Sequence, residues 1–360
     1  MFSNSDYINN LNNEFNNSKP FSKQDVFDEF EKYVVDKDCL RQVIDCGLFH
    51  YDYVQYRDFM KGTLFEDGIN VIIEVCRNAF LADSTRTSLG MKNGYANISK
   101  GFASYTQFAL LQTPIQEIER FDLLVKAAFQ MIGEWIENSL KPYVFFLNEM
   151  CRIIQNKPSL QAKLGVALDA LMAYNDVFCG LYKGLLLDVS ASQWRNIADH
   201  NDYVIKGDVI EIQYGSTDRI SKIVSRDDLM CVIKTIDTLL YMHKTAFTLL
   251  SIDYFSHMDI KAQSQSKNEN TNIDDCISQL VETSYAFNCQ LESIDLKVSP
   301  AEMVVNSKGT LLDKESLLKY LNIVGNFIDK NYHMLIYREG EMEYQVNYTD
   351  HKLYVYKYKI

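Results

Sequence analysis

Arg195 and His200 are the two residues whose types and spacing most clearly suggest chemistry. Histidine suits proton transfer because its side chain titrates near neutral pH. Arginine stays charged, and its planar guanidinium matches the geometry of phosphate oxygens. Such a pair fits cleavage of a phosphodiester, in which the attacking hydroxyl loses a proton while negative charge builds on the phosphate.

Helical geometry alone does not bring this pair together. Five positions turn about 140° around a helix, at about 100° per residue. Two arrangements could join the two side chains: fraying at a helix end, or pairing with the same segment of a second protomer. Asn196 lies four positions before His200 and could orient its imidazole, and Asp199 lies four positions after Arg195 and could hold its guanidinium.

The pattern Arg-Asn-x-x-x-His resembles the signature of the HEPN superfamily, small helical bundles that include many metal-independent ribonucleases. The resemblance covers roughly residues 115–255. It implies cleavage of RNA by attack of the 2′-hydroxyl, without a metal ion or cofactor, at a site on the interface of a symmetric dimer. The resemblance assigns catalysis to Arg195 and His200, and supporting roles to Asn196, Asp199 and Asn201.

The elements around the motif are expected to be amphipathic helices. Apolar residues recur at steps of three and four over 118–136, 145–154 and 160–185. A short helix is expected from Ser192 to about Tyr203, with Ser190 or Ser192 as its N-cap. Alternating residues around 210–223 then predict a β-hairpin, and an apolar stripe over 227–255 predicts one long helix.

The flanking regions show weaker patterns. Residues 1–20 form a lead-in rich in Asn and Ser, and residues 21–82 contain short helical patterns. Residues 83–101 are polar and contain glycine, which predicts a loop. The stretch from Lys261 to Ile273 has the composition of a linker. Beyond it, a helix over 314–328 and strands over 334–348 and 353–360 are expected.

These patterns predict a mainly α protein, in which a HEPN-like helical bundle with a small β-hairpin is joined to a small C-terminal α+β domain. The predicted boundaries are an N-terminal helical region over 1–110, the bundle over 111–260 and the C-terminal domain over 272–360.

Composition and charge bear on the protein's expected partners and location. The net charge of −12 argues against a general, charge-driven binder of nucleic acid, but it allows an enzyme with a small basic site. The N-terminus resembles no signal peptide, no stretch is apolar enough for a membrane span, and the cysteines are scattered without a C-x-x-C pair. A cytoplasmic protein with reduced thiols and no membrane association is expected, and the histidines show no zinc-ligand spacing.

Several interpretations of the motif remain open. The first is an endoribonuclease, of the toxin or phage-defence type that the superfamily often serves, with RNA as substrate and an antitoxin or regulatory protein as a further partner. The second is a HEPN bundle that binds a nucleotide or a protein without cutting, and the third is a structural helical protein. In the last case Arg195 and Asp199 form an ordinary surface pair, and His200 caps a helix end. His243 is expected to be a hydrogen-bonded histidine of the core or an interface.

Overall fold

The structure, a computed structural model, describes residues 8–9, 12–13, 19–45, 47, 49–111, 115, 118–215, 219–254, 280–281, 283–284, 287, 289–295, 301–307, 317, 320–321, 334–339, 342–349 and 352–359. The chain divides into two compact units. One is Gln55–Ser266, and the other combines Met1–Val54 with Lys267–Ile360. The described residues are mainly helical with smaller β elements, which confirms the predicted class. Among them, no helix has both the length and the apolar character that a membrane span requires.

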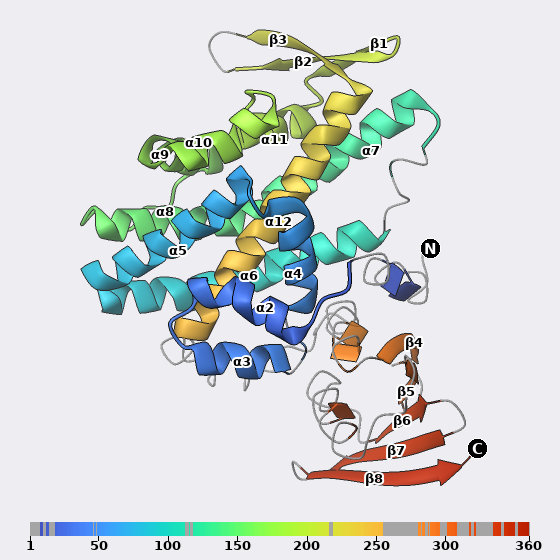
Figure 1. The fold of residues 1–360 in the computed structure, drawn as a ribbon. Coiled ribbons are helices and arrows are strands. Elements are labelled where there is room, and N and C mark those ends of the chain that lie inside the picture. The colour runs from blue at the N-terminus through green and yellow to red at the C-terminus, as the bar shows by residue number, and fades with distance from the viewer. Residues whose placement is uncertain are drawn as a thin grey trace. The chain divides into compact units, whose positions relative to one another are not determined.

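Gln55–Ser266 is a helical unit (Figure 1). Its helices before the motif include one continuous helical run, in which the π-helical turn η4 joins α7 to α8 without a break. The predicted apolar stripe over 160–185 is divided at Asn175, whose side chain accepts a hydrogen bond from the Val177 amide and so begins a new helix. The elements are η2 (Tyr56–Met60), α5 (Leu64–Ala82), α6 (Ser84–Leu111), α7 (Phe121–Glu134), η4 (Trp135–Leu140), α8 (Lys141–Ile154), α9 (Leu164–Tyr174), α10 (Asp176–Tyr182) and η5 (Gly184–Leu186).

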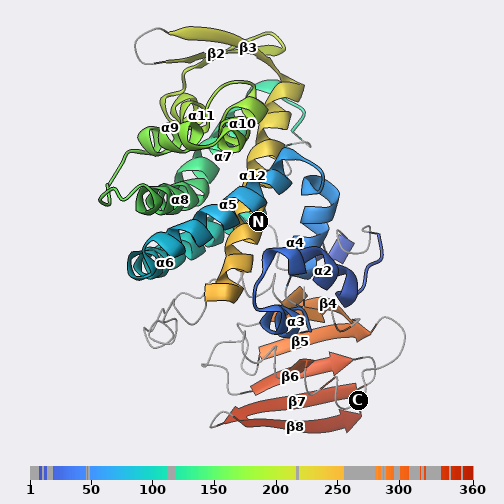
Figure 2. The same cartoon turned by 60° about the vertical axis from the view of Figure 1, so that its left-hand side comes forward.

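The long helix α12 (Arg226–Tyr254) is the central element of this unit (Figure 2). Ser225 and Asp228 start it with a capping box, in which each side chain bonds the other residue's backbone amide. The helix contacts α5, α7 and η4. Its predicted stripe is buried, and so are residues on its other faces, including Thr238, Met242 and Thr245. A helix buried on several faces lies inside a core rather than on its surface.

The prediction of a loop over residues 83–101 is wrong, because residues 84–101 belong to α6. The glycines that suggested a loop are positions of close helix packing. A Cβ atom on Gly94 would lie 2.8 Å from the Phe146 ring, and one on Gly101 would lie 2.8 Å from the Asn138 carbonyl oxygen. Glycine is required there by the neighbouring helix, so a polar, glycine-containing sequence still forms one long helix.

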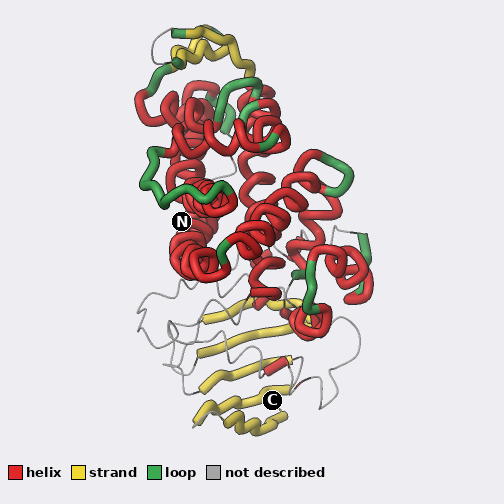
Figure 3. The backbone as a smooth tube through the Cα atoms, turned by 90° about the vertical axis from the view of Figure 1, so that its left-hand side faces the viewer, coloured by secondary structure: helices red, strands yellow, loops and turns green. Residues whose placement is uncertain are grey.

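The predicted hairpin is present as part of a three-stranded antiparallel sheet, which Figure 3 shows at one end of the helical unit. Its strands are β1 (Tyr203–Lys206), β2 (Val209–Tyr214) and β3 (Ile220–Ser225). Strand β1 was not expected, because the motif helix was predicted to continue to Tyr203. Ile210, Ile212 and Val224 are buried on one side of this sheet, which fixes its register.

The second unit combines short helices with a five-stranded sheet. The helices are α2 (Lys23–Phe30), η1 (Glu31–Tyr33), α3 (Lys37–Asp45) and α4 (His50–Gln55), and the strands are β4 (Cys289–Asp295), β5 (Ala301–Ser307), β6 (Met334–Glu339), β7 (Met342–Thr349) and β8 (Lys352–Lys359). The two strands predicted near the C-terminus correspond to β6–β7 and β8. Strands β5 and β6 are parallel, so the chain between them must cross over. The helix predicted over 314–328 falls in this crossover, and the structure describes it only at residues 317, 320 and 321, all helical.

The two units differ from the predicted domains. The sequence placed helices α5 and α6 in a separate N-terminal region. In the structure, α5 packs against α8 and α12, and α6 packs against α8 and η4. Residues before Gln55 belong with the C-terminal strands instead, as the buried hydrogen bond from the Asn12 side chain to the Leu291 carbonyl shows at 2.7 Å. The predicted linker over 261–273 lies outside the described residues.

Candidate functional site

The motif lies on α11 (Ala191–His200), a helix fixed by its apolar side. Ala191, Trp194 and Ile197 are buried, and the helix packs against α7, α9 and β2. The Trp194 indole Nε1 donates a hydrogen bond to the Leu186 carbonyl at 3.0 Å. Because the apolar side faces the core, the polar residues of the motif lie on the remaining surface of the helix.

Asn201 ends this helix. Its backbone is left-handed, with φ 53° and ψ 39°, and its amide donates to the Ile197 carbonyl. The Asp202 amide donates to the same carbonyl at 3.0 Å. Asparagine is one of the few residues that adopts this conformation readily, which explains the stop. The structure therefore gives Asn201, predicted as a supporting residue, a defined role in terminating α11.

Arg195 is held by three polar partners. Its Nε and Nη2 atoms both donate to Oε2 of Glu137, at 2.9 and 2.7 Å. Its Nη1 donates to Oδ1 of Asn196 at 3.0 Å, and its Nε lies 3.3 Å from Oδ2 of Asp199. The side chain of Arg195 is about one quarter exposed, with an exposed fraction of 26%. It is oriented before any ligand arrives, and part of its charge is neutralised.

Glu137 connects the motif to the π-turn η4. Its Oε2 accepts from Arg195, and its Oε1 accepts from the Lys141 ammonium one turn further along the chain. Burial raises the pKa of Glu137, but hydrogen bonds from Lys141 and Arg195 outweigh that effect and hold the pKa below its usual value. The carboxylate therefore stays charged between two cations.

The structure does not join Arg195 to His200. The helix is regular through His200, so the two residues remain on different faces. His200 is exposed, and it forms no hydrogen bond with any residue that the structure describes. The expected contact of Asn196 with His200 is replaced by one with Arg195, whereas the expected pairing of Arg195 with Asp199 is present.

A groove of about 420 Å³ adjoins the motif between α7, η4 and the end of α11. Glu137, Asn138, Asp199 and Asn201 contribute to its lining, and Lys126 adds a cation. Neither Arg195 nor His200 lines it. The helices α7 and α11 approach closely here, since a Cβ atom on Gly133 would lie 3.2 Å from that of Ala198.

Glu137 and Lys141 were not recognised from the sequence as parts of the site. Their spacing of four positions indicates that they pair with each other. Nothing in the sequence connects them with Arg195, which follows Glu137 by 58 positions. The contact depends on how α11 packs beside η4, which is a property of the tertiary structure.

The other histidine that the sequence singled out is confirmed as a core residue. His243 is buried on α12, its Nε2 lies 2.8 Å from the Tyr182 hydroxyl, and its ring stacks with that of Tyr143. Burial lowers the pKa of His243 to about 3. Within the described part of the chain, no three side chains of His, Cys, Asp or Glu are grouped so as to hold a metal ion.

No protein-family model matches the chain, and comparisons with curated proteins and with solved structures find no match.

Proposed function

We propose that this protein is a metal-independent endoribonuclease of the HEPN type, with Arg195 and His200 as its catalytic residues. The observation that supports this most is the state of Arg195, a partly exposed guanidinium that Glu137, Asn196 and Asp199 hold in one orientation. An arginine positioned in advance can receive a phosphate without first losing the entropy of a free side chain. His200 stands exposed at the end of the same helix.

The reaction would be a transesterification within the RNA. His200 takes the proton of a 2′-hydroxyl, whose oxygen attacks the adjacent phosphorus while the bond to the 5′-oxygen breaks. Arg195 stabilises the charge that develops on the phosphate oxygens. The products are a 2′,3′-cyclic phosphate and a 5′-hydroxyl.

The site would be shared between two protomers. One chain places Arg195 and His200 on different faces of α11, so a two-fold axis beside the helix is needed to bring the arginine of one protomer to the histidine of its partner. Strand β1 follows α11 directly and leaves Val204 half exposed. Ile223 on β3 is also more than half exposed and, like Val204, pairs with Glu211 of β2, so two apolar side chains share one face of this sheet beside the motif, and such a patch favours self-association.

The biological setting follows from the resemblance alone. A cytoplasmic toxin or phage-defence effector fits the proposed reaction, and such an enzyme needs an antitoxin or a regulatory protein that restrains it.

The experiment is incubation of the purified protein with RNA in EDTA, with detection of cyclic phosphate ends. The wild type should cleave, and Arg195→Ala and His200→Ala should each lower the rate about a hundredfold or more. Arg120→Ala is the matched control, because Arg120 also pairs with a nearby aspartate but is 71% exposed and outside the motif. Cleavage that persists in both motif variants would remove this pair from the mechanism.

The second candidate is a HEPN bundle that binds without cutting. One observation favours it: the Arg195 guanidinium is already paired with two carboxylates, as a structural arginine would be. A folded wild-type protein that binds RNA or a nucleotide and leaves RNA intact would support this candidate over the first.

A further inference from the structure

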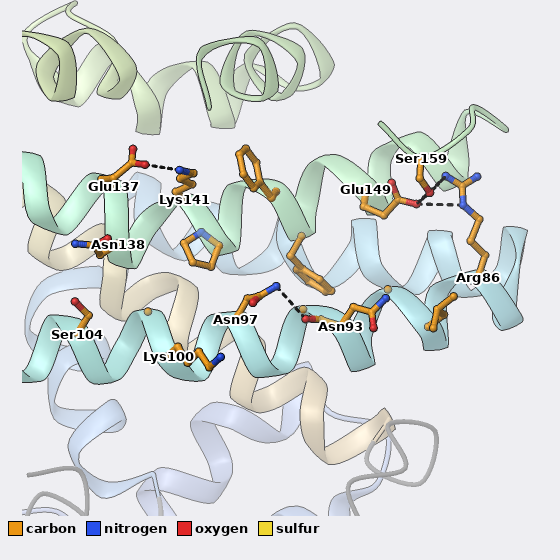
Figure 4. Close-up of a pocket in the computed structure, with 17 residues that line it drawn as sticks. Arg86, Asn93, Asn97, Lys100, Ser104, Glu137, Asn138, Lys141, Glu149 and Ser159 are labelled. Carbon is orange, nitrogen blue, oxygen red and sulfur yellow. Dashed lines mark hydrogen bonds and ion pairs between the residues drawn. The ribbon is translucent and has the colours of Figure 1, made fainter. Parts of the chain in front are cut away.

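A second groove, of about 610 Å³, runs between α6 and the continuous helix η4–α8 (Figure 4). Its lining extends along α6 from Arg86 to Ser104. Eighteen helical rises separate these two residues and span about 27 Å, so the groove suits an extended ligand better than a compact one.

The walls carry groups that suit nucleic acid. Asn93 and Asn97 project from α6, and Asn138 projects from η4 (Figure 4). Asn97 donates one amide hydrogen to the Asn93 backbone carbonyl at 3.3 Å, and Asn138 donates one to Glu134. Their amide oxygens and second amide hydrogens can accept from and donate to base edges. The half-buried ring of Phe145 lies in the wall beside them and offers an apolar surface on which a base can stack.

The charge of the groove differs from that of the whole protein. It contains three cations, Arg86, Lys100 and Lys141, and two carboxylates, although the chain carries a net charge of −12. Arg86 pairs with Glu149 at 2.7 Å, and Lys141 pairs with Glu137. Lys100 is exposed and forms no ion pair with any residue that the structure describes. One cation is therefore available to a phosphate without breaking an existing pair.

One end of the groove reaches Glu137, the carboxylate that holds Arg195. Glu137 and Asn138 line both this groove and the smaller one beside α11. Glu137 also bonds Arg195 and Lys141 at the same time. A strand lying along α6 would thus reach the residue that orients the proposed catalytic arginine.

We propose that the groove between α6 and η4–α8 binds single-stranded RNA and leads it to Arg195. This inference rests on the proposed ribonuclease function and names the form of its substrate. Unpaired bases can turn their edges toward asparagine amides and their faces toward Phe145, whereas the bases of a duplex are stacked and paired. Lys100 on α6 would contact the backbone, and Lys141 on the opposite wall adds positive charge while it stays paired with Glu137.

The test measures binding apart from cleavage. Full-length His200→Ala protein is titrated into a fluorescent single-stranded RNA of about 12 nucleotides, a length within the range of known single-strand sites. Fluorescence anisotropy gives the affinity. Lys100→Glu should weaken binding about tenfold or more, and Lys100→Ala should reduce the salt dependence by about one phosphate contact. Phe145→Ala should cost about fivefold or more.

Lys92→Ala is the matched control, because Lys92 lies on α6 but does not line the groove. It should leave the affinity unchanged, and a duplex of the same sequence should bind more weakly than the single strand. Circular dichroism checks that each variant is folded, and Lys100→Glu, at an exposed position, keeps the test valid if Phe145→Ala does not fold.

The inference would be overturned if Lys100→Glu, Phe145→Ala and Lys92→Ala all bound the single strand with the same affinity. It would also be overturned if the protein bound the duplex as tightly as the single strand. Groove-dependent binding by a wild-type protein that never cleaves would retain the groove and reject the ribonuclease. Wild-type cleavage with the same KM in all groove variants would retain the ribonuclease and reject the groove.

Discussion

Arg195 and Glu137 are joined by two hydrogen bonds to a single oxygen, in which Nε and Nη2 of the guanidinium donate to Oε2 of the carboxylate at 2.9 and 2.7 Å. The contact links α11 to η4. The other oxygen of Glu137, Oε1, accepts a hydrogen bond from Lys141, so the carboxylate binds two cations at once.

We predict that a double-mutant cycle of Arg195→Ala and Glu137→Ala gives a coupling of about 0.5–1 kcal/mol in urea denaturation, since partly exposed ion pairs contribute modestly. The control pair, Arg120 and Asp122, is more exposed and should give almost none. The pKa of Glu137 is lowered in the folded protein, so the coupling should be complete above the usual pKa of glutamate and disappear as pH falls through the lower folded value. A coupling that persists in strong acid would contradict the ion pair.

The buried His243 should make stability depend on pH. Its pKa is about 3 in the folded protein, so the unfolded chain binds a proton near pH 6.5 and below while the folded chain does not. The free energy of unfolding should fall as pH drops below 6.5, by up to about 1.4 kcal/mol per pH unit. His243→Gln does not titrate and should lose this slope between pH 6.5 and 5. Equal slopes for the two proteins would show that His243 is not the cause.

Mixing two inactive variants tests the shared site. Arg195→Ala and His200→Ala protomers, exchanged in a mixture, form heterodimers in which one site combines the intact arginine of one chain with the intact histidine of its partner. Random pairing should restore about a quarter of wild-type activity, because half of the dimers then carry one good site of two. Sites built within single protomers would give no recovery.

Two buried serines should respond to substitution in opposite directions. The Ser139 hydroxyl on η4 is buried without a hydrogen-bond partner among the described residues. Ser139→Ala should therefore raise the free energy of unfolding by up to about 1 kcal/mol. The Ser284 hydroxyl bonds the Leu280 carbonyl and the Tyr320 hydroxyl, so Ser284→Ala should lower it by about 1–2 kcal/mol. Thermal unfolding of both variants tests these expectations. A lower free energy of unfolding in Ser139→Ala would show that the Ser139 hydroxyl has a hydrogen-bond partner.

Limited proteolysis should cut between Lys261 and Asn272, where the composition offers little to bury. Since residues before Gln55 share a unit with the C-terminal strands, and Asn12 bonds Leu291, the two pieces should stay together in gel filtration. Separation of the pieces under native conditions would show that Met1–Val54 and Lys267–Ile360 do not form one unit.

Local sequence patterns predicted the elements that depend on local periodicity. The stripe along α12 and the alternation in β2 identified a helix and a strand, and spacing alone identified the pair of Arg195 and Asp199. The contact of Arg195 with Glu137 could not be predicted, because it depends on the packing of distant helices. Helix α6 was missed because glycine has the same local signature in a turn as at a close helix crossing.

The π-turn η4 has a consequence for insertions and deletions. It lies in one unbroken helical run whose first part, α7, packs on α11 and whose second part, α8, packs on α6. A π-turn contains one more residue than an α-helical turn, and one residue corresponds to a rotation of about 100°. Deleting a single residue from Trp135–Leu140 would keep the run helical but turn one groove away from the other. The length of this turn should therefore be fixed, because a change of one residue alters the direction of one groove relative to the other.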